Sequence, residues 1–152
     1  MEPWMVKRRR AMRVGSRMTV FLSRLTGGRF ISKLAPGEAP PVFLLTTTGR
    51  KSGKPRTVAL SYITDEGAVP ITVGTHGGLP TEPAWVLNLR ADPKATMQLD
   101  GKTTPVSAEF LQGAEWSQTW ERIIDEYPLY KDALATANRD VPIIRLHPRR
   151  EG

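Results

Sequence analysis

The amino-acid sequence predicts a small β-barrel of the α+β class with helices around it. Six short strand-like segments follow one another, and most are joined by connections short enough for hairpins. Helical patterns occur at the ends and in one crossover. The length of 152 residues, with 39% hydrophobic and 24% charged residues, fits one globular domain, and no internal repeat indicates a second.

The chain divides by charge into a basic arm, residues 1–35, and a nearly neutral body, residues 36–152. The arm contains nine Lys and Arg residues and one acid, for a net charge of +8. The body contains thirteen cations and fourteen acids, for a net charge of −1, so the total of +7 describes the arm. This distribution disfavours a basic nucleic-acid-binding domain.

The arm itself predicts a basic amphipathic helix over residues 5–26, which Gly27-Gly28 would end. Its apolar arc consists of Val14, Met18, Phe21, Leu22 and Leu25, and its basic stripe of Arg10, Arg13, Arg17 and Arg24. It lacks the uninterrupted apolar run of a secretory signal, and spanning a bilayer takes about 20 mostly apolar residues. Two alternatives stay open: the helix lies on an anionic membrane surface, or it packs on its own domain or on a second subunit of a homo-oligomer.

The first three strands follow a Pro- and Gly-rich linker at residues 35–41. Residues 42–48 (VFLLTTT) predict a buried strand, and residues 49–55 (GRKSGKP) a tight turn. Residues 56–64 continue with aliphatic and aromatic strand formers up to an Asp-Glu-Gly turn. Residues 69–75 (VPITVGT) then predict the third strand.

The second half of the chain begins with a loop at residues 76–82, after which Pro83 suits the first turn of a short helix. Asp100-Gly101 is the strongest short hairpin signal in the chain. The predicted elements are, in order, a helix from Pro83 to about Leu89, strands at 94–99 and 103–110, helices at 114–126 and after Pro128, and a strand at 141–146.

The turn GRKSGKPR is the strongest candidate for a binding site. It places Arg50, Lys51, Lys54 and Arg56 within seven residues, without an acid. Ser52 and Gly53 are small enough to let backbone N–H groups approach an anion, which suits a phosphate or a carboxylate-rich ligand. The spacing is not that of a Walker A loop, so it disfavours ATP and GTP. The alternative is an exposed hairpin turn with solvated cations.

Other candidate groups have ordinary structural alternatives. Gly77-Gly78 could let the backbone approach a ligand or form a plain loop. Trp85 and Asn88 share one helical face, and the alternatives are core packing for Trp85 and capping or satisfying the backbone for Asn88. Tyr127 and Tyr130 also share a face, and buried packing is the alternative for both.

Several reaction classes lack the residues that they need. The chain has no cysteine, which excludes disulfides and thiolate metal sites and fits a reducing cytosol. Two histidines, His76 and His147, are too few for most histidine-built metal centres, so no metal site is predicted. GxSxG, HExxH and GxGxxG are absent, which disfavours serine hydrolases, zinc proteases and dinucleotide-binding folds.

Taken together, the motifs resemble the deazaflavin-dependent nitroreductase family. The resemblance rests on LLTTTGRKSGKPR, GTHGG, PAWVLNL, ADPKATMQLDG and YPLY followed by RDVPIIRL, and it extends from about Leu25 to Pro148. It implies a split β-barrel related to FMN-binding oxidoreductases, and the cofactor coenzyme F-420, an 8-hydroxy-5-deazaflavin with a phosphate and a polyglutamate tail. It also implies that the reduced cofactor supplies the hydride, which suits a chain with few reactive side chains.

The resemblance assigns site residues to three segments. The implied cofactor-binding residues are Arg50, Lys51, Ser52, Gly53, Lys54, Pro55 and Arg56 in the turn, Gly74, Thr75, His76, Gly77 and Gly78 in the next loop, and Ala84, Trp85, Val86, Leu87 and Asn88 in the short helix. Tyr130 matches a tyrosine on the substrate side and would donate a hydrogen bond or proton to the acceptor.

The chain departs from the family pattern at four positions. His76 stands where the family commonly has Lys, Val86 where it has an aromatic residue, and Ala133 and Ser61 where some members have Tyr. The implied activity is hydride transfer to an enone, quinone or nitro-compound acceptor, in the cytoplasm or on the inner face of the cell membrane. The alternatives are an FMN-binding oxidoreductase of the same barrel, or a non-catalytic barrel that binds a cofactor or lipid.

Overall fold

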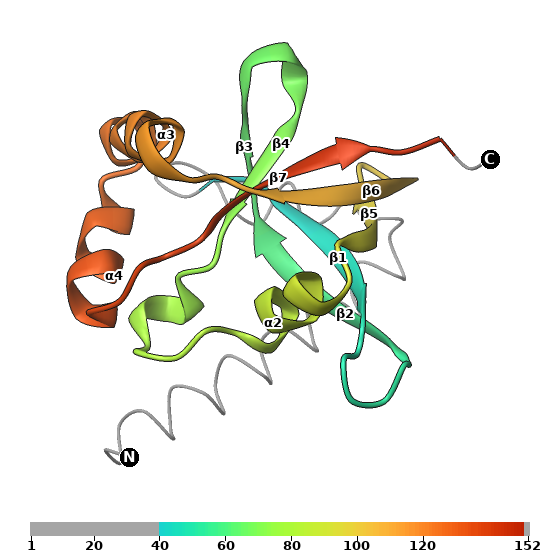
Figure 1. Ribbon diagram of the computed structural model, residues 1–152. Helices are drawn as coiled ribbons and strands as arrows, with labels where there is room; N and C mark the ends of the chain where they lie inside the picture. The colour runs from blue at the N-terminus through green and yellow to red at the C-terminus, as the bar shows by residue number, and fades with distance from the viewer. Residues whose placement is uncertain (1–39, 151–152) are drawn as a thin grey trace.

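The computed structural model describes residues 40–150, which form a curled antiparallel sheet with three α-helices (Figure 1). The predicted α+β class is thereby confirmed. The predicted arm, residues 1–35, and its helix at residues 5–26 lie outside the described residues.

Seven strands make the sheet within residues 40–150, in the order β2-β1-β5-β6-β7-β4-β3, and every neighbouring pair is antiparallel. The strands are β1 (Val42–Thr48), β2 (Pro55–Ser61), β3 (Ile63–Thr64), β4 (Pro70–Val73), β5 (Lys94–Leu99), β6 (Lys102–Phe110) and β7 (Ile143–Pro148). Asp100 and Gly101 join β5 to β6 with φ values of 49° and 78°, the positive values that a tight two-residue hairpin turn requires.

The prediction of one continuous strand over residues 56–64 was wrong, because these residues form two strands at opposite edges of the sheet. β2 pairs with β1 at one edge, and β3 pairs with β4 at the other. Tyr62 lies between them, and its N–H donates to the carbonyl of Pro41 at 2.9 Å. The Thr72 hydroxyl donates to the carbonyl of Ser61 at 3.0 Å, which brings the end of β2 to β4 and curls the sheet. A continuous run of strand-forming residues cannot reveal such a crossing.

The helices cover two separate parts of the sheet (Figure 1). α2 (Ala84–Ala91) packs on β1 and contributes Trp85, Val86 and Leu89 to a core cluster with β1, β5, β6 and β7. α3 (Gly113–Glu126) and α4 (Leu129–Ala137) enclose a second cluster with β3, β4 and β7. Two short 3-10 turns, η2 (Glu66–Ala68) and η3 (His76–Gly78), occupy the predicted loops.

An ion-pair network joins the β3–β4 connection to the second cluster. Arg145 on β7 contacts Asp65, Glu109 and Glu115 with nitrogen-to-oxygen distances of 2.5 to 2.6 Å, and Arg122 on α3 contacts Asp65 at 2.9 Å. Only 8% of the Asp65 side chain is exposed, so this carboxylate depends on its two arginine partners. The β3–β4 connection, which the network holds through Asp65, lies well away from the β1–β2 turn (Figure 1).

Candidate functional site

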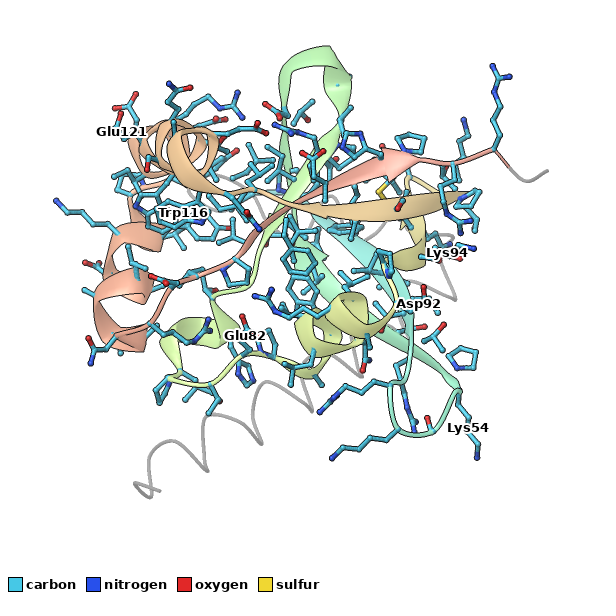
Figure 2. All side chains as sticks on the ribbon, in the orientation of Figure 1. Lys54, Glu82, Asp92, Lys94, Trp116 and Glu121 are labelled. Carbon is cyan, nitrogen blue, oxygen red and sulfur yellow. The ribbon has the colours of Figure 1, made fainter. Side chains whose placement is uncertain are left out.

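The β1–β2 turn carries the predicted cations outward into solvent. The Gly49 N–H donates to the Lys54 carbonyl at 2.8 Å and the Gly53 N–H to the Gly49 carbonyl at 2.7 Å, which closes the turn. Residues 50–56 are all exposed, and Lys54 projects from the tip of the turn (Figure 2). Among residues 40–150, no carboxylate forms an ion pair with the four cations of the turn. Their charge is therefore available to an anionic ligand.

Two hydrogen bonds to the Ser52 hydroxyl help to shape the turn. The Ser52 hydroxyl accepts a hydrogen bond from the Lys54 N–H at 3.2 Å and one from Arg56 Nη2 at 3.4 Å. A Cβ on Gly49 would lie 2.6 Å from Ser52 Oγ, so the position is closed to larger residues in this conformation. Gly49 and Ser52 are thus explained by the conformation of the turn itself.

Asn88 of α2 holds the start of this turn from behind. Its Oδ1 accepts hydrogen bonds from the Arg50 N–H and from Arg50 Nη1, both at 3.2 Å, and its Nδ2 donates to Thr47 Oγ1 at 3.0 Å. Asn88 is 4% exposed, and both the oxygen and the nitrogen of its amide form hydrogen bonds within the protein. The structure places this predicted cofactor-binding residue beneath the turn, where its contacts position Arg50.

The other predicted residues of α2 differ in exposure. Trp85, Val86 and Asn88 are buried, whereas Leu87 is half-buried and Ala84 is exposed. Among these five side chains, only those of Ala84 and Leu87 reach the surface to an appreciable extent. α2 therefore acts mainly as a rigid support for the turn.

The loop after β4 packs closely against α2 and α4. A Cβ on Gly74 would lie 2.7 Å from Pro142 Cγ and 2.9 Å from Val86 Cγ2, so only glycine fits there without a shift. His76 and Gly78 have φ values of 50° and 79°. The His76 Nδ1 donates to the Thr81 carbonyl at 2.9 Å, which folds the imidazole over its own loop.

The three predicted cofactor-binding segments therefore meet around α2. The turn reaches it through Asn88, and the loop reaches it through the contact between Gly74 and Val86. This convergence is a property of the chain path, since the segments are separated in the sequence.

Tyr130 on α4 lies apart from the cationic turn. It is 7% exposed within the second core cluster. Burial raises the pKa of its phenol to about 12, the neighbouring Tyr127 adds to the rise, and a hydrogen bond with Ser61 opposes it. Ser61 ends β2 and the turn precedes β2, so the two features are separated by the strand's length, roughly 20 Å at 3.3 Å per residue.

Arg139 is a residue of this region that the sequence did not single out. Its guanidinium donates to the carbonyls of Gly74, Thr75 and Leu79, which all belong to the loop after β4. An arginine in the mixed-charge segment ANRDVP carries no local signal of such a role. The order in which the motifs follow one another could have suggested it, because RDVP is part of the family resemblance.

A surface pocket of about 360 Å³ lies where the C-terminal part of α2, the end of β6, the start of α3 and the segment before β7 meet. It is lined by Arg90, Phe110, Leu111, Gln112, Gly113, Trp116, Asp140, Val141 and Pro142. None of the predicted site residues lines it. Within residues 40–150 no cluster of three His, Asp or Glu side chains is arranged to hold a metal ion.

Comparison with known proteins finds a family whose model matches most of the chain. The model of the F420H(2)-dependent quinone reductase family matches residues 14–148 of the chain. An F420H(2)-dependent quinone reductase of Mycobacterium tuberculosis is 35% identical to the chain over 130 residues, which is 83% of this chain and 85% of that protein.

Solved structures agree with the fold. The structure of an F420-H2 dependent reductase (FDR-A) has a TM-score of 0.62 at 33% sequence identity, and the match covers 70% of this chain and 94% of that one. A structure described as a domain-swapped dimer has a TM-score of 0.62 at 28% identity, covering 84% of this chain and 98% of that one. The split β-barrel that the resemblance implies is thereby confirmed.

Asn88→Ala is expected to destabilise the protein and to loosen the turn. The change leaves the Thr47 hydroxyl and the Arg50 N–H without their partner, and a buried polar group without a partner costs about 1–3 kcal/mol. We expect the free energy of unfolding in urea to fall by that amount and amide exchange at Arg50 to accelerate. Asn88→Asp is the matched control: it keeps the oxygen that accepts from Arg50 and replaces the amide donor to Thr47 by an oxygen to which the Thr47 hydroxyl can donate, so it should lose less. Equal stability of the wild type and the Ala variant would contradict this role.

Proposed function

The chain belongs to the F420H(2)-dependent quinone reductase family, and we propose that it transfers a hydride from reduced coenzyme F-420 to a quinone. The predicted dependence on coenzyme F-420 and the predicted reductase activity are confirmed by this membership. The quinone is the acceptor named for the family and for its mycobacterial relatives. Enone and nitro-compound acceptors stay predictions of the sequence.

The observation that carries the proposal is the exposed turn with four cations and no paired carboxylate among the described residues. Coenzyme F-420 bears a phosphate and a polyglutamate tail, so several separated anions need cations along one surface. FMN has a single phosphate and would leave most of this charge unused. The turn therefore fits the deazaflavin cofactor better than FMN.

We assign the parts of the site to different portions of the cofactor. Lys51, Lys54 and Arg56 would bind the tail and phosphate, and Arg50 is held at the root of the turn by Asn88. The loop at residues 74–78 and the exposed residues of α2 would contact the phosphate or ring end. When bound, the reduced deazaflavin supplies the hydride, and the protein supplies position and charge.

Tyr130 is proposed to act on the acceptor. With a pKa of about 12 the phenol is protonated at neutral pH, as an ordinary tyrosine also is, so the group is a hydrogen-bond donor there. A donor directed at a quinone oxygen would stabilise the negative charge that develops when the quinone accepts a hydride. Ser61, which bonds to this phenol, fixes its direction.

Replacing Lys51 and Arg56 by Ala together should weaken binding of coenzyme F-420 by tenfold or more. Both residues are exposed, so each contributes less than a buried charge-assisted contact, and the attraction should weaken as salt rises. Calorimetric titration at two ionic strengths measures both effects. Lys94→Ala with Lys102→Ala removes the same charge from β5 and β6 and should change affinity little. Tighter binding of FMN, or an equal loss in the control, would contradict the assignment.

Tyr130→Phe is expected to lower kcat with a quinone by about tenfold to a hundredfold, because one positioned donor is removed. The phenol has a pKa of about 12 in the folded protein, so its ionisation should leave the wild-type rate unaffected between pH 6 and about pH 10, with loss only as pH approaches 12. Steady-state rates with quinone, enone and nitro-compound acceptors give the comparison. Tyr127→Phe, a neighbouring and more exposed phenol, is the control. A higher kcat/KM with the nitro compound than with the quinone would refute quinone as acceptor.

We also propose that the basic amphipathic segment at residues 5–26 attaches the enzyme to an anionic membrane surface, where lipid-soluble quinones are found. The segment lies outside the described residues, so the proposal rests on its sequence: an apolar arc beside four arginines. Within residues 40–150 no helix is long and apolar enough to cross a membrane. The attachment we propose is peripheral, with the apolar arc on the membrane surface.

Full-length protein should sediment with anionic vesicles at low salt and stay in solution with neutral ones, since each cation near an anionic surface contributes about 1 kcal/mol. A variant without residues 1–24 should lose this sedimentation and keep its melting temperature. A large drop in melting temperature on truncation would instead indicate that the segment packs on the protein or on a second subunit.

A further inference from the structure

We propose that Arg139 is a positioning residue that holds the loop at residues 74–79 in the shape in which it binds the cofactor. The inference rests on the proposed function for the identity of the ligand. The loop shape itself rests on the contacts of one guanidinium with the backbone.

The guanidinium of Arg139 is surrounded by carbonyl oxygens. Its Nη2 donates to the carbonyls of Gly74 at 3.0 Å and Thr75 at 3.3 Å, and its Nε donates to the carbonyl of Leu79 at 3.2 Å. Its Nη1 donates to the carbonyl of Asp140 at 3.3 Å. One side chain thus joins the start and the end of the loop.

The chain brings Arg139 to this place by a turn at the end of α4. Asn138 ends the helix in the left-handed region, with φ 48° and ψ 43°, and its N–H donates to the Leu134 carbonyl at 3.3 Å. The loop also lies directly on α4, because a Cβ on Gly78 would be 3.3 Å from Thr136 Cβ. Arg139 therefore enters from the helix against which the loop packs.

The orientation of the carbonyls determines where the loop's N–H groups point. In a planar trans peptide the N–H lies opposite the preceding C=O. Because the carbonyls of Gly74 and Thr75 face Arg139, the N–H groups of Thr75 and His76 point to the opposite side of the loop. Successive N–H groups directed to one side form a concave surface that suits phosphate or carboxylate oxygens.

Neighbouring groups of the protein stabilise the positive charge of Arg139. Burial lowers the pKa of its guanidinium, and the carboxylate of Glu82 opposes that shift. Glu82 itself is bound by Arg90, in the last turn of α2, through two hydrogen bonds at 2.7 and 3.1 Å. Four carbonyls and one nearby carboxylate thus stabilise the guanidinium at its place between α4 and the loop.

Lysine cannot replace this residue, although it would keep the charge. A guanidinium presents several N–H donors in a planar fork, whereas an ammonium is a compact point charge. Arg139→Lys therefore separates geometry from charge. Arg122→Lys is the matched control, because Arg122 donates to Asp65 in the ion-pair network away from the loop.

The first measurement is amide exchange by NMR on the full chain without cofactor. The amides of Gly78 and Leu79 donate within the loop, to the carbonyls of Thr75 at 2.9 Å and His76 at 3.2 Å. In Arg139→Lys we expect both to exchange at least tenfold faster, while the Gly74 amide, which donates to Pro142 at 2.9 Å, changes little. Unchanged exchange at Gly78 and Leu79 would overturn the proposal.

The second measurement is the dissociation constant of coenzyme F-420 together with kcat at saturating cofactor. A displaced loop should raise the dissociation constant by about tenfold to a hundredfold and change kcat less than threefold. Added ethylguanidinium should restore part of the affinity of Arg139→Ala. Faster exchange with an unchanged dissociation constant would show a purely structural role and refute the proposal. Failure of the proposed function would appear separately, as absence of binding by the wild type.

Discussion

The buried amide of Asn88 is the contact on which the candidate site depends. It connects a helix that packs in the core to a turn that projects into solvent, through Arg50 on one side and Thr47 on the other. The cations of the turn repel one another, and residues 50–56 are all exposed. Its position is therefore set by hydrogen bonds from a rigid neighbour, and α2 supplies that rigidity through Trp85 and Val86.

A second support of the same kind holds the neighbouring loop. There an arginine donates to backbone carbonyls, whereas in the turn an asparagine accepts from a backbone N–H. In both places a polar side chain forms hydrogen bonds with the backbone of the segment that it holds. The cations of the turn and the N–H groups of the loop are left to face a ligand. This division suits a protein whose cofactor does the chemistry, because the chain has to provide position and charge.

The separation between the cationic turn and Tyr130 suits an elongated ligand. The two features lie at opposite ends of β2, and the loop after β4 packs between α2 and α4, the helices that support them. No predicted site residue lines the pocket beside α2, although Pro142, which does line it, accepts a hydrogen bond from the Gly74 N–H of the loop. The Arg145 network pairs with Asp65, Glu109 and Glu115, and none of these is a predicted cofactor-binding residue.

The sequence by itself determined the features that depend on near neighbours along the chain. The hairpin at Asp100-Gly101, the cationic turn and the boundaries of most strands and helices follow from local residue preferences, because turn geometry depends on the few residues in it. Only the tertiary structure separated β2 from β3, gave Asn88 its partner 38 residues away, placed Arg139 beneath a loop 65 residues earlier and joined Tyr130 to Ser61. These contacts depend on the path of the chain through space, which long-range packing decides and which no local pattern records.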